Sequence, residues 1–376
     1  MNRHDPQLGV FIRKHASAAA SYCDVALLCV MSDERQKKLI EIEEKTENNI
    51  RSFVIYFRKF NSPIQLLNII INFLRYIKAN RTGLKEIEKK FGSHDITHAY
   101  IMLRPAIIAW WLKLTRRIPF VIGEQWSGYA TGKFSSKNSF TKTIYRYIFR
   151  KADAATVVSE FLKLKMEAVG LKNNYSITPN VIELVERKKS PLPENGKIKI
   201  ITVADLVDEI KNISATIRAI AEISKTNKQI EFHIIGHGKD EMMLKDLARS
   251  LNILDEVVFF HGVKTNEEVF QYLYSSQFLV MNSYFETFSL ICIEAMGCGI
   301  PVIATRCGGP DEFMNDENGI LIDPGKPDML IHAIERMIAG YKSYNSINLT
   351  RYATMRFSAE ETGKKMEDIY LSLLEN

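Results

Sequence analysis

The chain has 376 residues, more than a single hydrophobic core usually organises. This length predicts two domains of roughly 150 to 200 residues with a cleft between them. Hydrophobic residues make up 46% and charged residues 25%, with only 11 prolines, which is typical of a soluble globular protein and excludes a low-complexity chain. Residues 1–190 carry a net charge of +15 and the remainder carries −9. This asymmetry favours a polyanionic or membrane-surface partner for the first half, unless its lysines only solvate helices.

The five cysteines are scattered and lie mostly in apolar runs, which favours a reducing compartment over a disulfide framework. Neither Cys-x-x-Cys nor His-Glu-x-x-His occurs, so we expect no structural zinc. The polar N-terminus does not resemble a secretory signal, and no run of about 18 apolar residues is found. We therefore expect a cytoplasmic protein.

The first half begins with a loop-like segment and then a helical pattern in "VFIRKHASAAA" at 10–20. A doubly wound domain normally begins with a strand, so we expect its first strand to be missing here. The strands predicted after it, with helices between them, are 25–30, 53–56, 96–99, 120–123 and 155–158.

The second half alternates strands and helices at the pace of a parallel, doubly wound sheet. Its predicted strands are 198–204, 231–235, 257–260, 278–281, 302–304 and 320–322, with helices that include 212–225 and 240–251. The segment "KKSPLPENGK" reads as a linker because its prolines and glycine disfavour regular structure. We therefore expect an N-terminal domain at 1–187, a C-terminal domain at 188–357 and a final helix at 358–376.

Two carboxylates, Glu286 and Glu294, lie eight residues apart in the mostly apolar stretch 283–305. Glu286 lies on the loop between a predicted strand and a helix at about 289–297, and Glu294 lies inside that helix. The amides and dipole at the helix N-terminus favour phosphate, and carboxylates accept hydrogen bonds from sugar hydroxyls. A ligand that carries both groups would use the whole arrangement, although each acid alone is more often structural.

Residues 282–310 resemble the signature of family 4 glycosyltransferases. The family's E-x7-E motif matches Glu286 and Glu294, and "EAMGCGIPVIAT" and "GGPDE" follow it. Weaker matches are at 5–16, 157–166, 177–183, 234–241, 257–263 and 318–325. The resemblance implies a retaining enzyme of the α/β GT-B fold, with two doubly wound Rossmann-like domains facing a cleft and a C-terminal helix that returns to the first.

The resemblance also assigns the donor site. Glu286 would hold hydroxyls of the donor sugar, and Glu294 would hold the ribose. The amides that would bind the pyrophosphate are those around Phe288, Ser289 and Leu290. No cofactor is implied beyond a nucleotide-sugar donor, with a UDP- or GDP-sugar expected.

Other positions follow from the same resemblance. Lys211 would neutralise the leaving diphosphate. Gly262 and Val263 would lie near the base, and Gly9 would face the phosphates. Gln125 occupies the place where the family often has a histidine near the sugar, so it can bond a hydroxyl but carries no charge.

The sequence departs from the family at a second position. Asp205 stands where the family usually has an arginine, a few residues before the lysine that corresponds to Lys211. Lys239 is a candidate to supply the missing positive charge. Two alternatives stay open: a nucleotide-sugar epimerase or hydrolase of the same fold, and a non-catalytic nucleotide-sugar-binding protein, which these departures favour. No Asp-x-Asp occurs, which predicts a site without a metal ion.

The stretch 100–117 combines two tryptophans with four basic residues, so it fits either burial against the first sheet or a membrane interface. With the basic first half, it predicts peripheral contact with an anionic membrane and an oligosaccharide or lipid-linked acceptor. No nucleic-acid motif accompanies the charge, so nucleic acid is not an expected partner.

Overall fold

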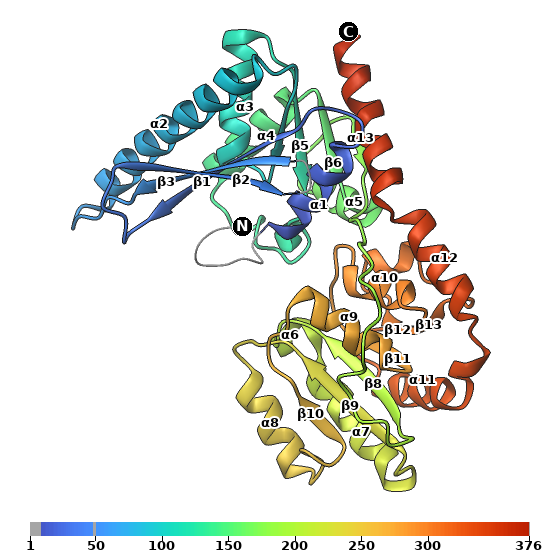
Figure 1. The fold of residues 1–376 in the computed structure, drawn as a ribbon. Helices are drawn as coiled ribbons and strands as arrows, with labels where there is room; N and C mark the ends of the chain where they lie inside the picture. Colours follow the sequence, from blue (N-terminus) through green and yellow to red (C-terminus); the bar gives the residue numbers. More distant parts are fainter. Residues whose placement is uncertain (1–8, 48–49, 376) are drawn as a thin grey trace. The chain divides into compact units, whose positions relative to one another are not determined.

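The computed structural model describes residues 9–47 and 50–375 (Figure 1). The first four residues of the weaker family match at 5–16, residues 5–8, lie outside this range. The chain divides into two compact units. Unit 1 comprises the described residues up to Val158, together with Lys165–Val181 and the segment from Ala359, and unit 2 comprises Ser159–Leu164 and Ile182–Ser358.

The crossing into unit 2 lies before the predicted linker. Val181 is buried in unit 1, and the amide of Ile182 donates to the carbonyl of Phe357 (3.0 Å) inside unit 2. Residues 181–197 contain no helix or strand, but the part from Ile182 onward already belongs to unit 2. The boundary is therefore at 181/182 rather than 187/188.

Unit 1 contains two sheets rather than one. In the first, β1 (Ala26–Asp33) pairs in parallel with β3 (Ile50–Arg58), which pairs antiparallel with β2 (Ile40–Glu47). The second is parallel throughout, with the order β4 (Thr97–Tyr100), β5 (Phe120–Glu124), β6 (Ala154–Val157) and β7 (Tyr175–Ile177). The helices of unit 1 are α1 (Val10–Ala19), α2 (Gln65–Phe91), α3 (Arg104–Arg116), α4 (Ser139–Lys151) and α13 (Ala359–Leu374). Helix α5 (Glu160–Ala168) is shared between the units.

The C-terminal helix α13 returns to unit 1, as the resemblance implies, and packs against α1 (Figure 1). Gly363 makes this close approach possible, because a Cβ atom added there would lie 2.2 Å from the carbonyl oxygen of Ala18. The absence of a side chain at this position lets the two helix backbones touch.

Unit 2 is built on a six-stranded parallel sheet with the order β10-β9-β8-β11-β12-β13. The strands are β8 (Ile198–Val203), β9 (Ile230–Ile235), β10 (Val258–Phe260), β11 (Phe278–Met281), β12 (Val302–Thr305) and β13 (Gly319–Ile322). The helices are α6 (Asp208–Lys211), α7 (Ile213–Thr226), α8 (Glu241–Ser250), α9 (Asn266–Tyr274), α10 (Leu290–Gly297), α11 (Pro327–Gly340) and α12 (Ser346–Arg356).

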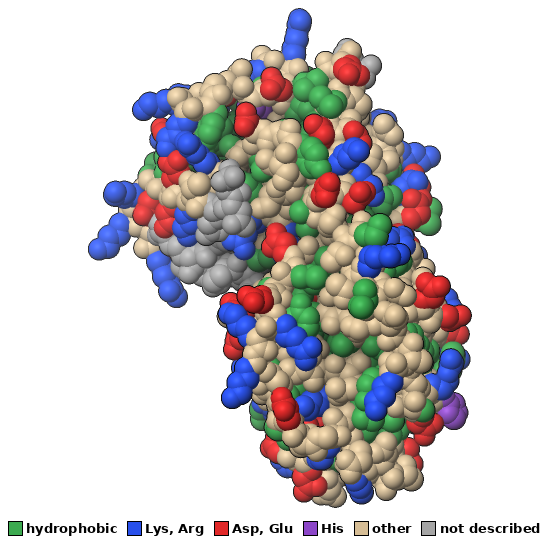
Figure 2. Space-filling view, turned by 45° about the vertical axis from the view of Figure 1, so that its right-hand side comes forward, with side chains coloured by type: hydrophobic (Ala, Val, Ile, Leu, Met, Phe, Trp, Pro, Cys, Tyr) green, Lys and Arg blue, Asp and Glu red, His purple; other side chains and the backbone are tan. Residues whose placement is uncertain are grey.

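The strand order of unit 2 reverses between β8 and β11, since β9 lies on one side of β8 and β11 on the other. In open parallel sheets, ligands bind beyond the carboxyl ends of the strands at such a reversal. The strands themselves are apolar and buried, with side chains such as Ile200, Phe232 and Phe278 fully inside. On the face shown in Figure 2, basic and acidic side chains are interspersed over unit 2.

Candidate functional site

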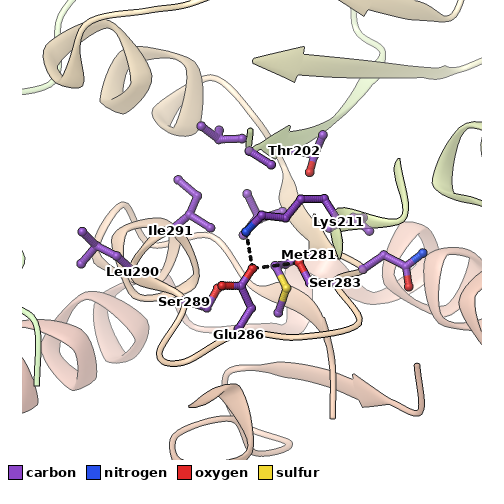
Figure 3. Close-up of a pocket in the computed structure, with 13 residues that line it drawn as sticks. Thr202, Lys211, Met281, Ser283, Glu286, Ser289, Leu290 and Ile291 are labelled. Carbon is purple, nitrogen blue, oxygen red and sulfur yellow. Dashed lines mark hydrogen bonds and ion pairs between the residues drawn. The ribbon is translucent and has the colours of Figure 1, made fainter. Parts of the chain in front are cut away.

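The loop after β11 holds Glu286 by its backbone. The amide of Glu286 donates to the carbonyl of Cys307 (3.1 Å), and its carbonyl accepts from the amide of Gly309 (2.9 Å). Gly309 allows this approach, since an added Cβ would lie 2.4 Å from the Cα of Phe288. With its backbone fixed, Glu286 directs its carboxylate into a pocket (Figure 3).

Lys211 and Ser283 both bind this carboxylate. Lys211 Nζ lies 2.6 Å from Glu286 Oε1, and Ser283 Oγ donates to the same oxygen at 2.8 Å. The side chains of Lys211 and Glu286 are 23% and 15% exposed, so solvent and salt screen this pair less than a surface pair. The short helix α6, which carries Lys211, is fixed to the loop because the amide of Tyr284 donates to the carbonyl of Ile210 (2.7 Å).

The pocket lies at the carboxyl ends of β8 and β11, where the strand order reverses. The residues that line it are Thr202, Val203, Ala204, Lys211, Leu279, Val280, Met281, Asn282, Ser283, Glu286, Ser289, Leu290 and Ile291. Ser289 adopts a left-handed conformation (φ 70°) at the start of α10, so the first amides of this helix follow directly from the pocket wall. The arrangement offers an ammonium group and helix amides for an anion, and a carboxylate for hydroxyl groups.

Two predicted donor residues lie elsewhere in this region. Glu294 is buried in α10 and is not among the residues that line the pocket. The side chain of Phe288 is also buried, and its ring packs against the rings of Phe313 and Phe357. Any contact of Phe288 with a ligand would therefore come from its backbone.

Gly262 and Val263 follow β10 at the same edge of the sheet but do not line the pocket. Gly262 has a positive φ (66°), and its carbonyl accepts from the amide of Gly236 (2.9 Å). Val263 is 69% exposed. The turn therefore presents an apolar side chain to solvent next to the loop after β9.

The two remaining predicted residues belong to unit 1. Gly9 precedes α1 with φ 78°, a conformation that favours glycine. Gln125 follows β5, and its buried Nε2 finds no hydrogen-bond partner among residues 9–47 and 50–375. A buried amide donor that lacks a partner costs free energy, so this atom is a candidate ligand contact.

Glu124, beside Gln125, is a buried acid that was not predicted as a site residue. Its carboxylate accepts from the amide of Met102 (2.6 Å) and from the hydroxyl of Tyr129 (2.9 Å), and burial raises its pKa. Through Met102 it holds the turn after β4, where Leu103 has a positive φ (100°). An acid that ends the apolar run "FVIGE" is the signal that would have found it.

Neither Asp205 nor its candidate substitute Lys239 lines the pocket. Asp205 is exposed, and Lys239 is 62% exposed, 3.8 Å from Glu209. Among the described residues that line the pocket, Lys211 is the one cation. Ser283 and Thr202, which the sequence analysis did not select, do line it; only their positions at strand ends point to them.

Comparison with known proteins gives one family. Residues 184–353 match the sequence model of the glycosyl transferases group 1. A relative from Campylobacter jejuni, N-acetylgalactosamine-N,N'-diacetylbacillosaminyl-diphospho-undecaprenol 4-alpha-N-acetylgalactosaminyltransferase, is 26% identical over 349 residues, with 88% of this chain and 90% of the relative covered.

Solved structures show the same fold over almost the whole chain. Sucrose-phosphate synthase from Thermosynechococcus elongatus has a TM-score of 0.74 at 19% identity, and the match covers 97% of this chain and 93% of that one. HepE of Anabaena in complex with UDP has a TM-score of 0.67 at 17% identity, with 85% and 86% covered. Residues 184–353 are therefore similar to the group 1 glycosyl transferases, and the chain has the GT-B fold.

Proposed function

We propose that the protein is a retaining glycosyltransferase that moves a sugar from a nucleotide-sugar donor to a glycan or lipid-linked glycan in surface polysaccharide synthesis. The observation that carries the proposal is the cluster of Lys211, Ser283 and Glu286 in the pocket at the strand-order reversal of unit 2. A nucleotide sugar suits both charged groups of this pocket, because its diphosphate would pair with Lys211 and its sugar hydroxyls would donate to Glu286.

Donor binding would separate the ion pair. The ammonium of Lys211 would turn from Glu286 Oε1, 2.6 Å away, to the diphosphate oxygens, where charge grows as the leaving group departs. The carboxylate of Glu286 would then accept hydrogen bonds from sugar hydroxyls while Ser283 keeps its orientation. The acceptor hydroxyl would attack from the face that the diphosphate leaves, and a phosphate oxygen would take its proton.

Two observations support a lipid-linked acceptor. The name of the relative from Campylobacter jejuni describes transfer to a saccharide on diphospho-undecaprenol. The first 190 residues carry a net charge of +15, which suits an acceptor with a diphosphate and contact with an anionic membrane. Gln125, whose buried Nε2 has no hydrogen-bond partner among the described residues, is proposed to bond a sugar hydroxyl.

The test is product analysis with a panel of UDP- and GDP-sugars and a diphosphate-linked lipid acceptor. We expect one donor to yield a new glycoside with the anomeric configuration of the donor, read from the anomeric coupling constant by NMR. The opposite configuration would overturn the retaining assignment. Free sugar or a new nucleotide sugar without acceptor would indicate a hydrolase or an epimerase, and tight binding without turnover would indicate a binding protein.

The same assay tests whether a metal ion is needed. We expect the rate to be unchanged after treatment with EDTA, because Lys211 and the amides at the start of α10 would supply the positive potential at the diphosphate. A rate that falls with EDTA and returns with Mg²⁺ would contradict this part of the proposal.

A further inference from the structure

An apolar surface covers the first three turns of α2. The buried residues of this helix begin at Tyr76, whereas large hydrophobic side chains before it are exposed by 39% to 66%. We call them the α2 apolar surface: Ile64, Leu66, Leu67, Ile69, Ile70, Phe73 and Leu74. Exposed apolar surfaces of this extent mark sites of interaction.

The polar side chains of these turns are already used on the inner side of the helix. Asn68 exchanges hydrogen bonds with the backbone of Ser62 (2.7 and 2.8 Å), and Asn72 does so with the backbone of Phe60 (2.8 Å each). One turn later, Arg75 donates to the carbonyl of Arg58 (2.6 Å). Because this side binds the segment that leads into the helix, the apolar side chains are left to face outward.

Along the chain, the charged residues that flank this surface have one sign, although Lys59 pairs with Glu34 (2.5 Å). Residues 58–85 contain six Lys and Arg and no Asp or Glu. Ile70 and Leu74 are followed at helical spacing by Lys78 and Arg81, which are exposed, so basic groups continue the outward face of the helix. An apolar face bordered by cations is complementary to a surface that has an apolar interior and anionic head groups.

We propose that the α2 apolar surface docks into the interface of an anionic lipid bilayer, with Lys78 and Arg81 on the lipid phosphates. The apolar segment 64–74 is shorter than the roughly 20 residues that a spanning helix needs, which favours a helix lying in the interface. None of the helices in the described part of the chain is long and apolar enough to cross a membrane.

Of the two alternatives for the stretch 100–117, the structure favours burial for much of α3. In α3, Ala106, Ala109 and Leu112 are buried, and the ring of Trp110 packs on Tyr147. This helix uses its apolar side within unit 1, whereas the first turns of α2 do not.

The position of the surface deepens the proposed function and rests on it. Strands β1 and β3 are parallel, so their carboxyl ends share one edge of the sheet, and α2 begins shortly after β3 ends there. Figure 1 shows α2 running along this sheet. Since ligands of parallel strands bind at their carboxyl edge, a lipid-linked acceptor in the docked bilayer would meet unit 1 on that edge.

The experiment is vesicle co-sedimentation of the full chain, which requires no sugar transfer. The vesicles contain phosphatidylcholine alone or with about one third phosphatidylglycerol. We expect binding to the anionic vesicles that salt weakens. The triple variant Leu66→Ser, Ile70→Ser, Leu74→Ser should bind them on the order of 100-fold more weakly, and Lys78→Gln with Arg81→Gln should weaken binding on the order of tenfold.

A control removes three large apolar side chains from unit 2 that are at least as exposed, Met242→Ser, Ile347→Ser and Met355→Ser, and should bind like wild type. Near-wild-type binding by the α2 triple variant, or equal wild-type binding to neutral vesicles, would overturn the proposal. So would a wild-type dimer that the α2 substitutions dissociate, without vesicle binding, since the surface would then join two copies. Vesicle binding without any transferase activity would instead refute the proposed function and leave the docking surface standing.

Discussion

Acidification should destabilise unit 1 through His15, a residue of α1 whose side chain is 1% exposed. Its Nε2 lies 3.1 Å from the carbonyl oxygen of Pro179, and its Nδ1 lies 3.1 Å from the hydroxyl of Tyr100. The carbonyl accepts from a protonated Nε2, and in the neutral ring that burial favours, Nδ1 accepts from the tyrosine hydroxyl. Burial lowers the pKa of His15 to about 4.

The direction of the pH dependence of stability follows from comparison with the unfolded chain, in which histidine has a pKa near 6.5. Between pH 6.5 and about 4 the unfolded state binds a proton that folded His15 does not, so stability present above pH 6.5 is lost as the pH falls. At pH 5 the loss is about 2 kcal/mol relative to pH 7.5. His98, whose pKa burial lowers to about 3, adds a loss of about the same size.

The assay is urea unfolding followed by tryptophan fluorescence, because the three tryptophans, Trp110, Trp111 and Trp126, all lie in unit 1. In His15→Gln, the difference in unfolding free energy between pH 7.5 and pH 5 should shrink by about 2 kcal/mol. The control His332→Gln changes an exposed histidine of unit 2 and should leave the difference unchanged. An unaltered pH dependence in His15→Gln would refute the reasoning.

Three further predictions concern single side chains. Gly363→Ala should lower the free energy of unfolding, followed by circular dichroism, by about 2 kcal/mol, because the new Cβ would meet the Ala18 carbonyl. The control Gly340→Ala has open space around it and should leave the stability unchanged. Equal effects of the two substitutions would contradict the packing argument. Lys211→Gln should lower kcat on the order of 100-fold with the fold intact, and an unchanged kcat would remove Lys211 from the reaction. Ser283→Ala removes one hydrogen bond to Glu286 and should lower kcat/KM about fivefold; an effect as large as that of Lys211→Gln would show that Ser283 does more than orient Glu286.

The strands of unit 2 could be predicted closely because each is a short apolar run between turn residues. Strand β11 coincides with the predicted 278–281, and β12 extends the predicted 302–304 by one residue. The missed strand β2, "IEIEEKTE", carries four acids and pairs only at the sheet edge, so its conformation depends on β3 rather than on its own hydrophobicity.

The candidate site was predictable in part for a similar reason. The motif places Glu286 by its own spacing, and the resemblance points to Lys211. The ion pair between them joins residues 75 positions apart, and Ser283 joins it only because β11 ends there. The first turns of α2 expose their apolar side because Asn68 and Asn72 bind the segment before the helix, and hydrophobic periodicity does not encode these contacts.

The central claim is that the carboxylate of Glu286 holds the donor sugar during transfer. The most direct test is kcat/KM of Glu286→Ala with the identified donor and acceptor, together with its thermal unfolding. We expect a loss on the order of 100-fold or more, because a charged hydrogen-bond acceptor is removed, while the variant stays folded. Turnover close to wild type in a folded Glu286→Ala protein would contradict it.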